Sequence, residues 1–284
     1  MQHIEFFDIS HFENNYYRVK PLPELGSFID FFWETRFDDL LEENPEGFSD
    51  ALFPNIGYTY LINLGTPFVM QVGEKKFNMR TDGFLPRSKA IECYHKPGNR
   101  LFGIKFKISP IIFKTKVNFS EYKEYIYPLS YLMEQSVIDK VKKAATFEER
   151  IETLNEYFLS LIRSYSGTWD AIHIVSEILQ YCDRENDFTK TVEEFAAQYK
   201  ISARSLHRYF ESTTSLSSKK ALQVLRIRKA VQQLAGNPED FKYGDYGYYD
   251  YSHFCKHLKQ FLQKDTVSSI QPHLKLLQRV SNKK

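Results

Sequence analysis

The hydrophobic and polar positions follow two different periods along this chain. Residues 57–65 (GYTYLINLG) and 101–109 (LFGIKFKIS) alternate, and in the second segment Phe102, Ile104, Phe106 and Ile108 fall on one face. A period of two is typical of a half-buried β-strand. Turn-forming stretches with glycine, proline or aspartate lie between such segments, at 65–67, 72–76, 81–83 and 96–99. The residues up to about 115 therefore predict several short strands of a sandwich or barrel.

Beyond about residue 120 the period becomes helical. In residues 148–165 the side chains of Ile151, Leu154, Phe158 and Leu161 recur at helical spacing, and Ser166-Gly167 ends the pattern. Residues 169–183 predict a further helix, and the chain from Thr189 onward is again helical and basic. We expect an α+β protein with a boundary near 164–168. Its domains are 1–165, which is β-rich with trailing helices, and 166–284, which is all-α.

The segment 191–211 (TVEEFAAQYKISARSLHRYFE) predicts a helix-turn-helix unit. Thr191 and Glu194 fit a capping box at the start of the first helix, and Ser202 is a suitable N-cap for the second. The apolar face of the first helix comprises Val192, Phe195, Ala196 and Tyr199, and that of the second comprises Leu206, Tyr209 and Phe210. Small Ala196 would let the two helices cross closely.

The outward face of the second predicted helix carries Arg204, Ser205, His207 and Arg208. A helix of this kind enters the major groove of DNA, where arginine makes bidentate contacts to guanine. We therefore expect these four residues to contact DNA. The alternative is a solvated helix face whose arginines are incidental.

The distribution of charge supports an anionic partner for the C-terminal third. Residues 189–284 contain 17 Lys+Arg and 8 Asp+Glu, whereas the other 188 residues contain 21 and 28, although the whole chain carries only +2. A basic segment joined to an acidic body favours nucleic-acid binding by the basic part. A generic basic surface would give the same charge count.

Three segments in order resemble the AraC/XylS family of transcriptional regulators. Ser202, Leu206, Arg208 and Phe210, preceded by Phe195-Ala196, are similar to its first helix-turn-helix. Residues 225–230 (LRIRKA) followed by Leu234 are similar to its long connecting helix, and residues 247–259 (GYYDYSHFCKHLK) to its second unit. The resemblance covers about residues 169–261. It implies two helix-turn-helix units joined by a long helix, and a transcriptional regulator, activator or repressor, with double-stranded DNA and RNA polymerase as partners.

The second unit also follows physical rules. Asp250 is placed to cap a helix whose buried face is Phe254, Leu258 and Phe261. By resemblance, the DNA-contacting positions are Tyr251, Ser252, Cys255 and Lys256. The helix before it departs from the family pattern, because bulky Tyr243 and Gly244 stand where small and helix-forming residues are usual, and glycine costs about 1 kcal/mol in a helix. We expect an irregular leading helix there, and base contacts mainly from the first unit.

The N-terminal part resembles the β-rich domain of one subset of the same family. The resemblance rests on Pro23, the aromatic run 28–33, residues 61–68 (LINLGTPF) and residues 101–106 (LFGIKF). It implies a cupin-like barrel or sandwich for sensing a small-molecule effector or for pairing two copies of the chain. The aromatic faces with Tyr58 and Tyr60, and with Phe102 and Phe106, are candidates for lining an effector pocket. They fit a hydrophobic core equally well.

The remaining sequence features argue against an enzyme or a metalloprotein. Cys93-Tyr94-His95 offers two soft ligands, but no HxH, HExxH or spaced acidic partner completes a set, so we expect no metal and no cofactor. Walker A, GxGxxG and GxSxG motifs are absent from the sequence. The alternative function is a cupin-like enzyme or small-molecule binder with an accessory helical domain, which a metal assay would distinguish. A protein–protein adaptor is a second alternative.

The expected location is the cytoplasm. The three cysteines, Cys93, Cys182 and Cys255, are odd in number and far apart, which fits a reducing compartment. The N-terminal residues lack the pattern of a secretory signal, and no uncharged apolar run approaches the roughly 18–20 residues of a membrane helix.

Overall fold

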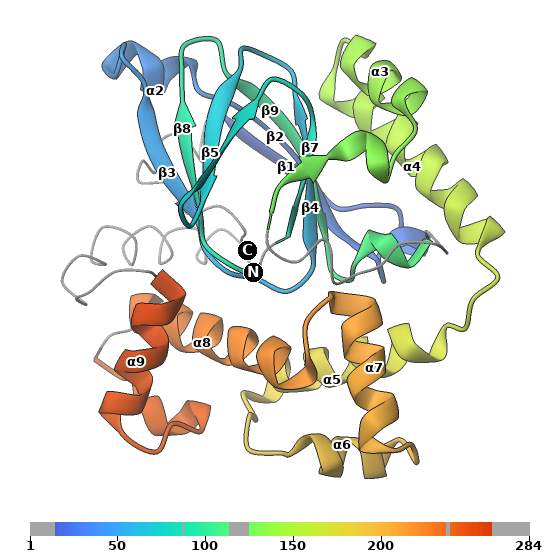
Figure 1. Ribbon diagram of the computed structural model, residues 1–284, viewed down its shortest axis with the longest axis vertical. Helices are drawn as coiled ribbons and strands as arrows, with labels where there is room; N and C mark the ends of the chain where they lie inside the picture. The colour runs from blue at the N-terminus through green and yellow to red at the C-terminus, as the bar shows by residue number, and fades with distance from the viewer. Residues whose placement is uncertain (1–14, 87, 114–124, 237–238, 263–284) are drawn as a thin grey trace.

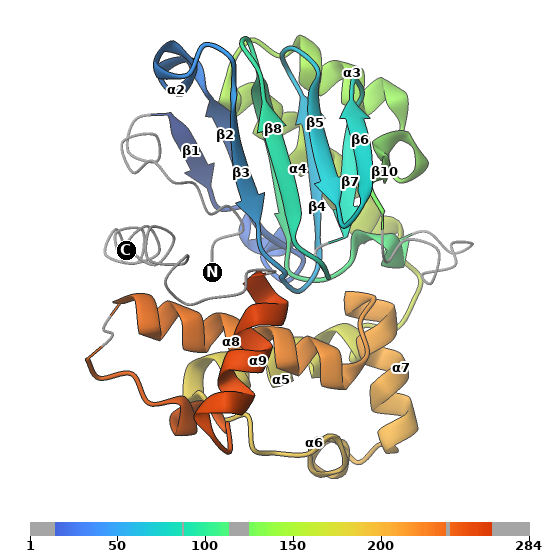
Figure 2. The same cartoon turned by 60° about the vertical axis from the view of Figure 1, so that its left-hand side comes forward.

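The computed structural model describes residues 15–86, 88–113, 125–236 and 239–262. A β-rich part is stacked on a helical part, so the predicted α+β class is confirmed (Figures 1 and 2). The strands are β1 (Tyr16–Val19), β2 (Ile29–Arg36), β3 (Phe48–Leu52), β4 (Tyr58–Asn63), β5 (Phe68–Val72), β6 (Lys75–Met79), β7 (Gly83–Pro86), β8 (Ile91–His95), β9 (Arg100–Phe106) and β10 (Tyr127–Pro128). The α-helices are α2 (Asp38–Glu43), α3 (Gln135–Lys143), α4 (Phe147–Ser164), α5 (Asp170–Glu185), α6 (Val192–Gln198), α7 (Ala203–Thr214), α8 (Ser218–Gly236) and α9 (Tyr251–Leu262).

The strands form two antiparallel sheets. One has the order β1-β2-β9-β4-β7-β10 and the other β3-β8-β5-β6. The two alternating segments of the sequence are β4 and β9, which pair with each other near the middle of the larger sheet, with Tyr60 opposite Ile104. Both strand predictions are confirmed.

The larger sheet is the middle layer of three, because its two faces pack against different partners. The face with Tyr58, Tyr60, Phe102 and Phe106 lies in a core with α3 and α4. The opposite face, with Phe31, Trp33, Leu61 and Leu101, packs against Phe68, Met70, Ile91 and Cys93 of the smaller sheet. Successive side chains of a strand point to opposite faces, so each central strand of the larger sheet contributes side chains to both cores.

A buried ion pair fastens α4 to the larger sheet. Arg150 Nη1 donates to Glu34 Oε2 at 3.0 Å, and its Nη2 donates to the carbonyl of Ala144 at 2.7 Å. Both charged side chains are almost fully buried, and Arg100 approaches Glu34 Oε1 at 3.6 Å. A capping box, in which Thr146 accepts from the Glu149 amide at 3.2 Å, starts the helix one turn earlier.

The helical part contains two small cores that share α8. Ala221 and Val224 in its first half pack with α5, α6 and α7. Ile227, Ala230 and Val231 in its second half pack with Phe254, Leu258 and Phe261 of α9. Figure 1 accordingly places α7 beside one end of α8 and α9 beside the other. No helix of the described ranges is both long and apolar enough to cross a membrane.

The loop between β3 and β4 joins the β-rich part to both helical cores. Phe53 packs in the core around α9 and Ile56 in the core around α7. Arg228 of α8 is buried and donates to the carbonyl of Pro54 at 2.6 Å, while its guanidinium lies 5.6 Å from the Phe261 ring. A second contact runs from the Ser109 amide to the carbonyl of Thr213 at 2.5 Å.

We predict that Glu34→Ala lowers the free energy of unfolding by about 3–5 kcal/mol, because it leaves the Arg150 guanidinium buried without its carboxylate. Urea denaturation measures the change. The double variant Glu34→Leu/Arg150→Met should recover much of the loss, and Glu24→Ala, at an exposed position, should change little. A loss below about 1 kcal/mol for Glu34→Ala would show that the pair does not fasten α4.

Candidate nucleic-acid interface

The first helix-turn-helix unit forms as its sequence predicts. The Thr191 amide donates to Glu194 Oε2 at 2.6 Å, and the Glu194 amide donates to Thr191 Oγ1 at 3.2 Å, so the capping box is complete. The Ser205 amide donates to the Ser202 hydroxyl at 3.0 Å and begins α7. Phe195 and Ala196 of α6 are buried against Leu206 and Phe210 of α7.

The turn between these helices has a feature that the sequence did not reveal. Lys200 has a positive φ of 55°, a conformation that L-residues adopt at a cost. The Ile201 amide donates to the carbonyl of Ala196 at 3.0 Å across this turn. The residue with positive φ at a helix end is usually glycine. Because a lysine stands here instead, the sequence did not indicate the positive φ of Lys200.

The four predicted residues of α7 lie together on one side of the helix. Arg204, His207 and Arg208 are exposed and Ser205 is half-buried. His207 is held in place by a 2.8 Å contact between its Nδ1 and the Ser218 hydroxyl at the start of α8. All four line a groove of about 660 Å³, whose other walls include Val192, Glu193, Ser218 and Lys219. The groove presents cationic and hydrogen-bonding groups beside the helix.

The second unit has a regular recognition helix behind an irregular turn. The His253 amide donates to Asp250 Oδ1 at 2.7 Å, which confirms the predicted cap. Phe254, Leu258 and Phe261 are buried. Residues 243–246, where we expected an irregular helix, form only a 3-10 turn that Gly247 ends with a φ of 70°.

The second set of predicted residues lies on the outer side of α9. Tyr251, Ser252 and Lys256 are exposed, and Cys255 is half-buried. This set is not contiguous with the set on α7, because α7 and α9 pack against opposite halves of α8. The structure therefore presents two separate polar faces rather than one cluster.

The four effector candidates lie in the core between the larger sheet and its helices. Tyr58, Tyr60, Phe102 and Phe106 are each at most 2 % exposed. Their rings pack on other aromatic rings, for example Phe106 on Phe158 at 5.5 Å and Phe102 on Phe147 at 5.9 Å. Phe106 also lines the cavity between β9 and α5.

A histidine on α9 has an altered ionisation. His257 Nε2 lies 2.9 Å from Gln223 Nε2, and its Nδ1 lies 3.3 Å from Arg226 Nη2. Partial burial, followed by the positive charge of Arg226, lowers the pKa of His257 to about 4. Arg226 also stacks on Tyr248 at 4.4 Å. Sequence spacing did not indicate these contacts, because they join α8 to α9.

The geometry defines a class of protein: a β-sandwich followed by a helical region with two helix-turn-helix units at the ends of a long helix. No protein-family model matches the chain, and no curated protein sequence matches it either. Several solved structures are similar to it.

One structural neighbour is ToxT from Vibrio cholerae O395, with 11% identity over 93% of this chain and 96% of ToxT, at a TM-score of 0.44. ToxT bound to (E)-4-(8-methylnaphthalen-1-yl)but-3-enoic acid gives 10% identity over 93% and 98% of the chains, at a TM-score of 0.46. The AraC-like transcriptional activator CuxR gives 9% identity over 79% and 90%, at a TM-score of 0.31.

We predict that His257→Gln makes stability less sensitive to acid. An unfolded histidine has a pKa of about 6.5, whereas that of folded His257 is about 4. Between these values the unfolded chain binds a proton that the folded chain does not, so this group lowers stability as pH falls through that window. Urea denaturation at pH 7 and at about pH 4.5 should show a smaller loss for His257→Gln than for the wild type. Equal losses would contradict the assigned pKa.

Proposed function

We propose that this chain is a sequence-specific DNA-binding transcriptional regulator. The observation that carries the proposal is the pair of capped helices, α7 and α9, whose outer faces are polar or cationic and which flank α8. Helix-turn-helix proteins insert such a helix into the major groove, and its N-terminal residues contact base edges. Residues 166–284 would form the DNA-binding domain and residues 1–165 the sensing or pairing domain, with RNA polymerase or a second copy as further partners.

In this proposal α7 contributes most of the base contacts. Arg204 and Arg208 are one turn apart, and both are exposed. Two like charges at this spacing repel weakly in water, whereas an anionic partner attracts both. On α9, Tyr251, Ser252, Cys255 and Lys256 would contact DNA, with Lys256 neutralising a phosphate. The accompanying release of counterions makes binding strongly dependent on salt.

We predict that Arg204→Ala weakens specific binding by about 1–3 kcal/mol and relaxes base preference at one position. Lys256→Ala should instead weaken binding to all sequences alike and lower the salt slope by about 1. The experiment first selects binding sites from a random pool of double-stranded oligonucleotides with the full chain, and then measures affinities by gel shift at several salt concentrations.

Arg163→Ala is the matched control, because Arg163 is an exposed arginine in the last turn of α4, outside both units. It should bind as the wild type does. A pool without enriched sequences would contradict the whole proposal. Unchanged affinity and base preference in Arg204→Ala would contradict the role of α7.

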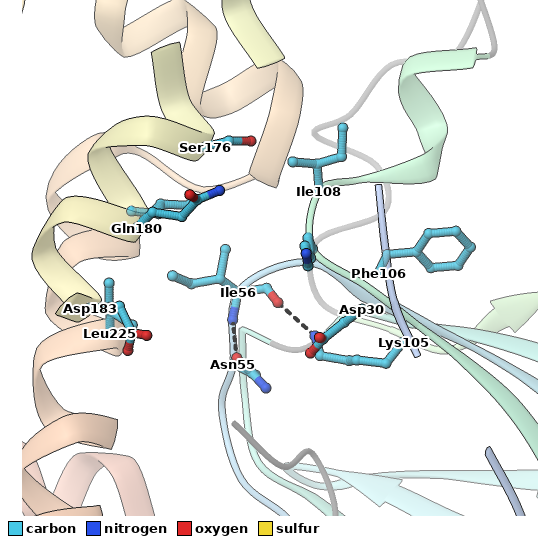
Figure 3. Close-up of a pocket in the computed structure, with 12 residues that line it drawn as sticks. Asp30, Asn55, Ile56, Lys105, Phe106, Ile108, Ser176, Gln180, Asp183 and Leu225 are labelled. Atoms are coloured by element: carbon cyan, nitrogen blue, oxygen red, sulfur yellow. Dashed lines mark hydrogen bonds between the residues drawn. The ribbon is translucent and has the colours of Figure 1, made fainter. Parts of the chain in front are cut away.

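We further propose that a small-molecule effector binds between the two parts of the chain. A cavity of about 190 Å³ lies between the end of β9 and helices α5 and α8 (Figure 3). The sandwich contributes Asp30, Lys105 and Ile108, and the helices contribute Ser176 and Gln180, among others. Lys105 Nζ donates to the carbonyl of Ile56 at 2.7 Å. An engineered cavity of about 150 Å³ holds benzene, so this one suits a ring-sized ligand with a polar group.

Its position suits a regulatory ligand, because Asn55 and Ile56 on its wall belong to the loop that contacts both helical cores. ToxT has been crystallised with an unsaturated fatty acid bound.

We predict that Ser176→Trp abolishes stabilisation by cavity ligands. Ser176 is half-buried on the cavity wall, and an indole there would occupy the space. The probes are benzoate, phenol and related small ring compounds, tested by thermal melting of the full chain. Ser164→Trp, at an exposed position at the end of α4, is the control and should keep the response. Stabilisation that survives in Ser176→Trp, or none with any probe, would exclude this cavity as the effector site.

A further inference from the structure

Three side chains with metal-binding atoms meet inside the sandwich. They are Asp50 of β3 and Cys93 and His95 of β8, and their ligand atoms all lie within 4.8 Å of one another. Asp50 is the direct cross-strand partner of Cys93, and His95 follows on the same face two residues later. All three residues are buried, at 4 %, 3 % and 3 % exposure. Strand pairing thus supplies the acidic partner that the sequence around Cys93 and His95 lacks.

The hydrogen bonds of His95 direct one ring nitrogen at Asp50. Asn99 Nδ2 donates to the carbonyl of Thr66 at 3.3 Å, which leaves Asn99 Oδ1 to accept from His95 Nδ1 at 2.6 Å. The Nδ1 atom therefore carries a proton. His95 Nε2 then faces Asp50 Oδ1 at 3.2 Å. At this distance His95 Nε2 and Asp50 Oδ1 can share a proton, or both can bind one metal ion.

The hydrogen bond from His95 Nδ1 to Asn99 Oδ1 is of the kind that metal-bound histidines usually make. Such histidines donate their second ring nitrogen to a carboxylate, carbonyl or similar acceptor, which fixes the tautomer and the ring orientation. Asn99 is itself fully buried and held by the Thr66 carbonyl. The His95 ring is further fixed by Phe37, at 4.2 Å between centroids, and by Phe68, which stacks on it at 5.4 Å.

Cys93 belongs to the apolar core between the two sheets, where neutralisation of acidic groups is favoured. Cys93 pairs across the sheet with Met70 on its other side, and both belong to the core between the two sheets. A buried carboxylate is costly unless it is paired or bound to a metal. A divalent ion would neutralise Asp50 together with the thiolate of Cys93.

We propose that Asp50, Cys93 and His95 bind a divalent transition-metal ion of the zinc type. Imidazole nitrogen, thiolate sulfur and carboxylate oxygen are the three ligand types that Zn²⁺ takes, at about 2.0–2.3 Å. In a tetrahedral set these atoms lie about 3.3–3.5 Å apart, so a small contraction of the present triad forms the site. The ion links β3 to β8 within the sandwich through three buried ligands.

The test titrates the full-length, untagged protein with Co²⁺ after treatment with a chelator. We expect one equivalent to bind with a thiolate-to-cobalt charge-transfer band, and Zn²⁺ to displace it. Cys93→Ser and Cys93→Ala should each lose the band, while His95→Gln and Asp50→Asn should bind at least tenfold more weakly. Asn99→Ala should weaken binding about 10–100-fold through the orientation of His95.

Cys182→Ser and Cys255→Ser are the matched controls, since Cys182 is a buried cysteine and Cys255 a half-buried one, both in the helical part. Both should keep the band. Zn²⁺ should also raise the melting temperature of the wild type relative to chelator, and this measurement needs no variant. No band in the wild type, or a band that depends on Cys182 or Cys255, would overturn the proposal and assign a proton to the space between His95 and Asp50.

Discussion

The insertion of the β3–β4 loop into the helical part is the contact on which the arrangement of the molecule depends. Phe53 and Ile56 enter two different helical cores, and the buried guanidinium of Arg228 bonds to the carbonyl of Pro54 between them. A buried cation is stable only while it has such partners. Because α8 packs on α7 with one half and on α9 with the other, the loop fixes the helix that positions both candidate recognition helices.

The same loop connects the other notable features of the structure. It begins directly after β3, which carries Asp50, and Asn55 and Ile56 line the cavity beside α5. The strand β3, the wall of the cavity and the Arg228 contact with Pro54 therefore all adjoin one short segment of the chain. Coupling between two sites needs an element that both adjoin, and the five residues 53–57 are such an element here.

Local patterns made much of the fold predictable, and contacts distant in sequence made the rest unpredictable. The alternation around Tyr60 and Ile104 gave β4 and β9, and Thr191, Ser202 and Asp250 marked the beginnings of α6, α7 and α9. In contrast, the pairing of Asp50 with Cys93 depends on the strand register, and that of Arg228 with Pro54 joins residues 174 positions apart. The alternation at Phe102 and Phe106 showed a buried face but not that α4 covers it.

The two helix-turn-helix units differ in how far their cores depend on the rest of the chain. Around α7, helices α5, α6 and α7 and the first half of α8 already enclose Leu206 and Phe210. Around α9, the leading helix is reduced to a 3-10 turn, because Gly244 and Tyr243 do not favour a helix there. Phe53 of the sandwich packs against Phe261 at 5.6 Å and fills part of that core. Ile56 enters the core around α7 in the same way, but three helices besides α8 enclose that core, so the second unit has fewer helices of its own around the residue that the sandwich contributes.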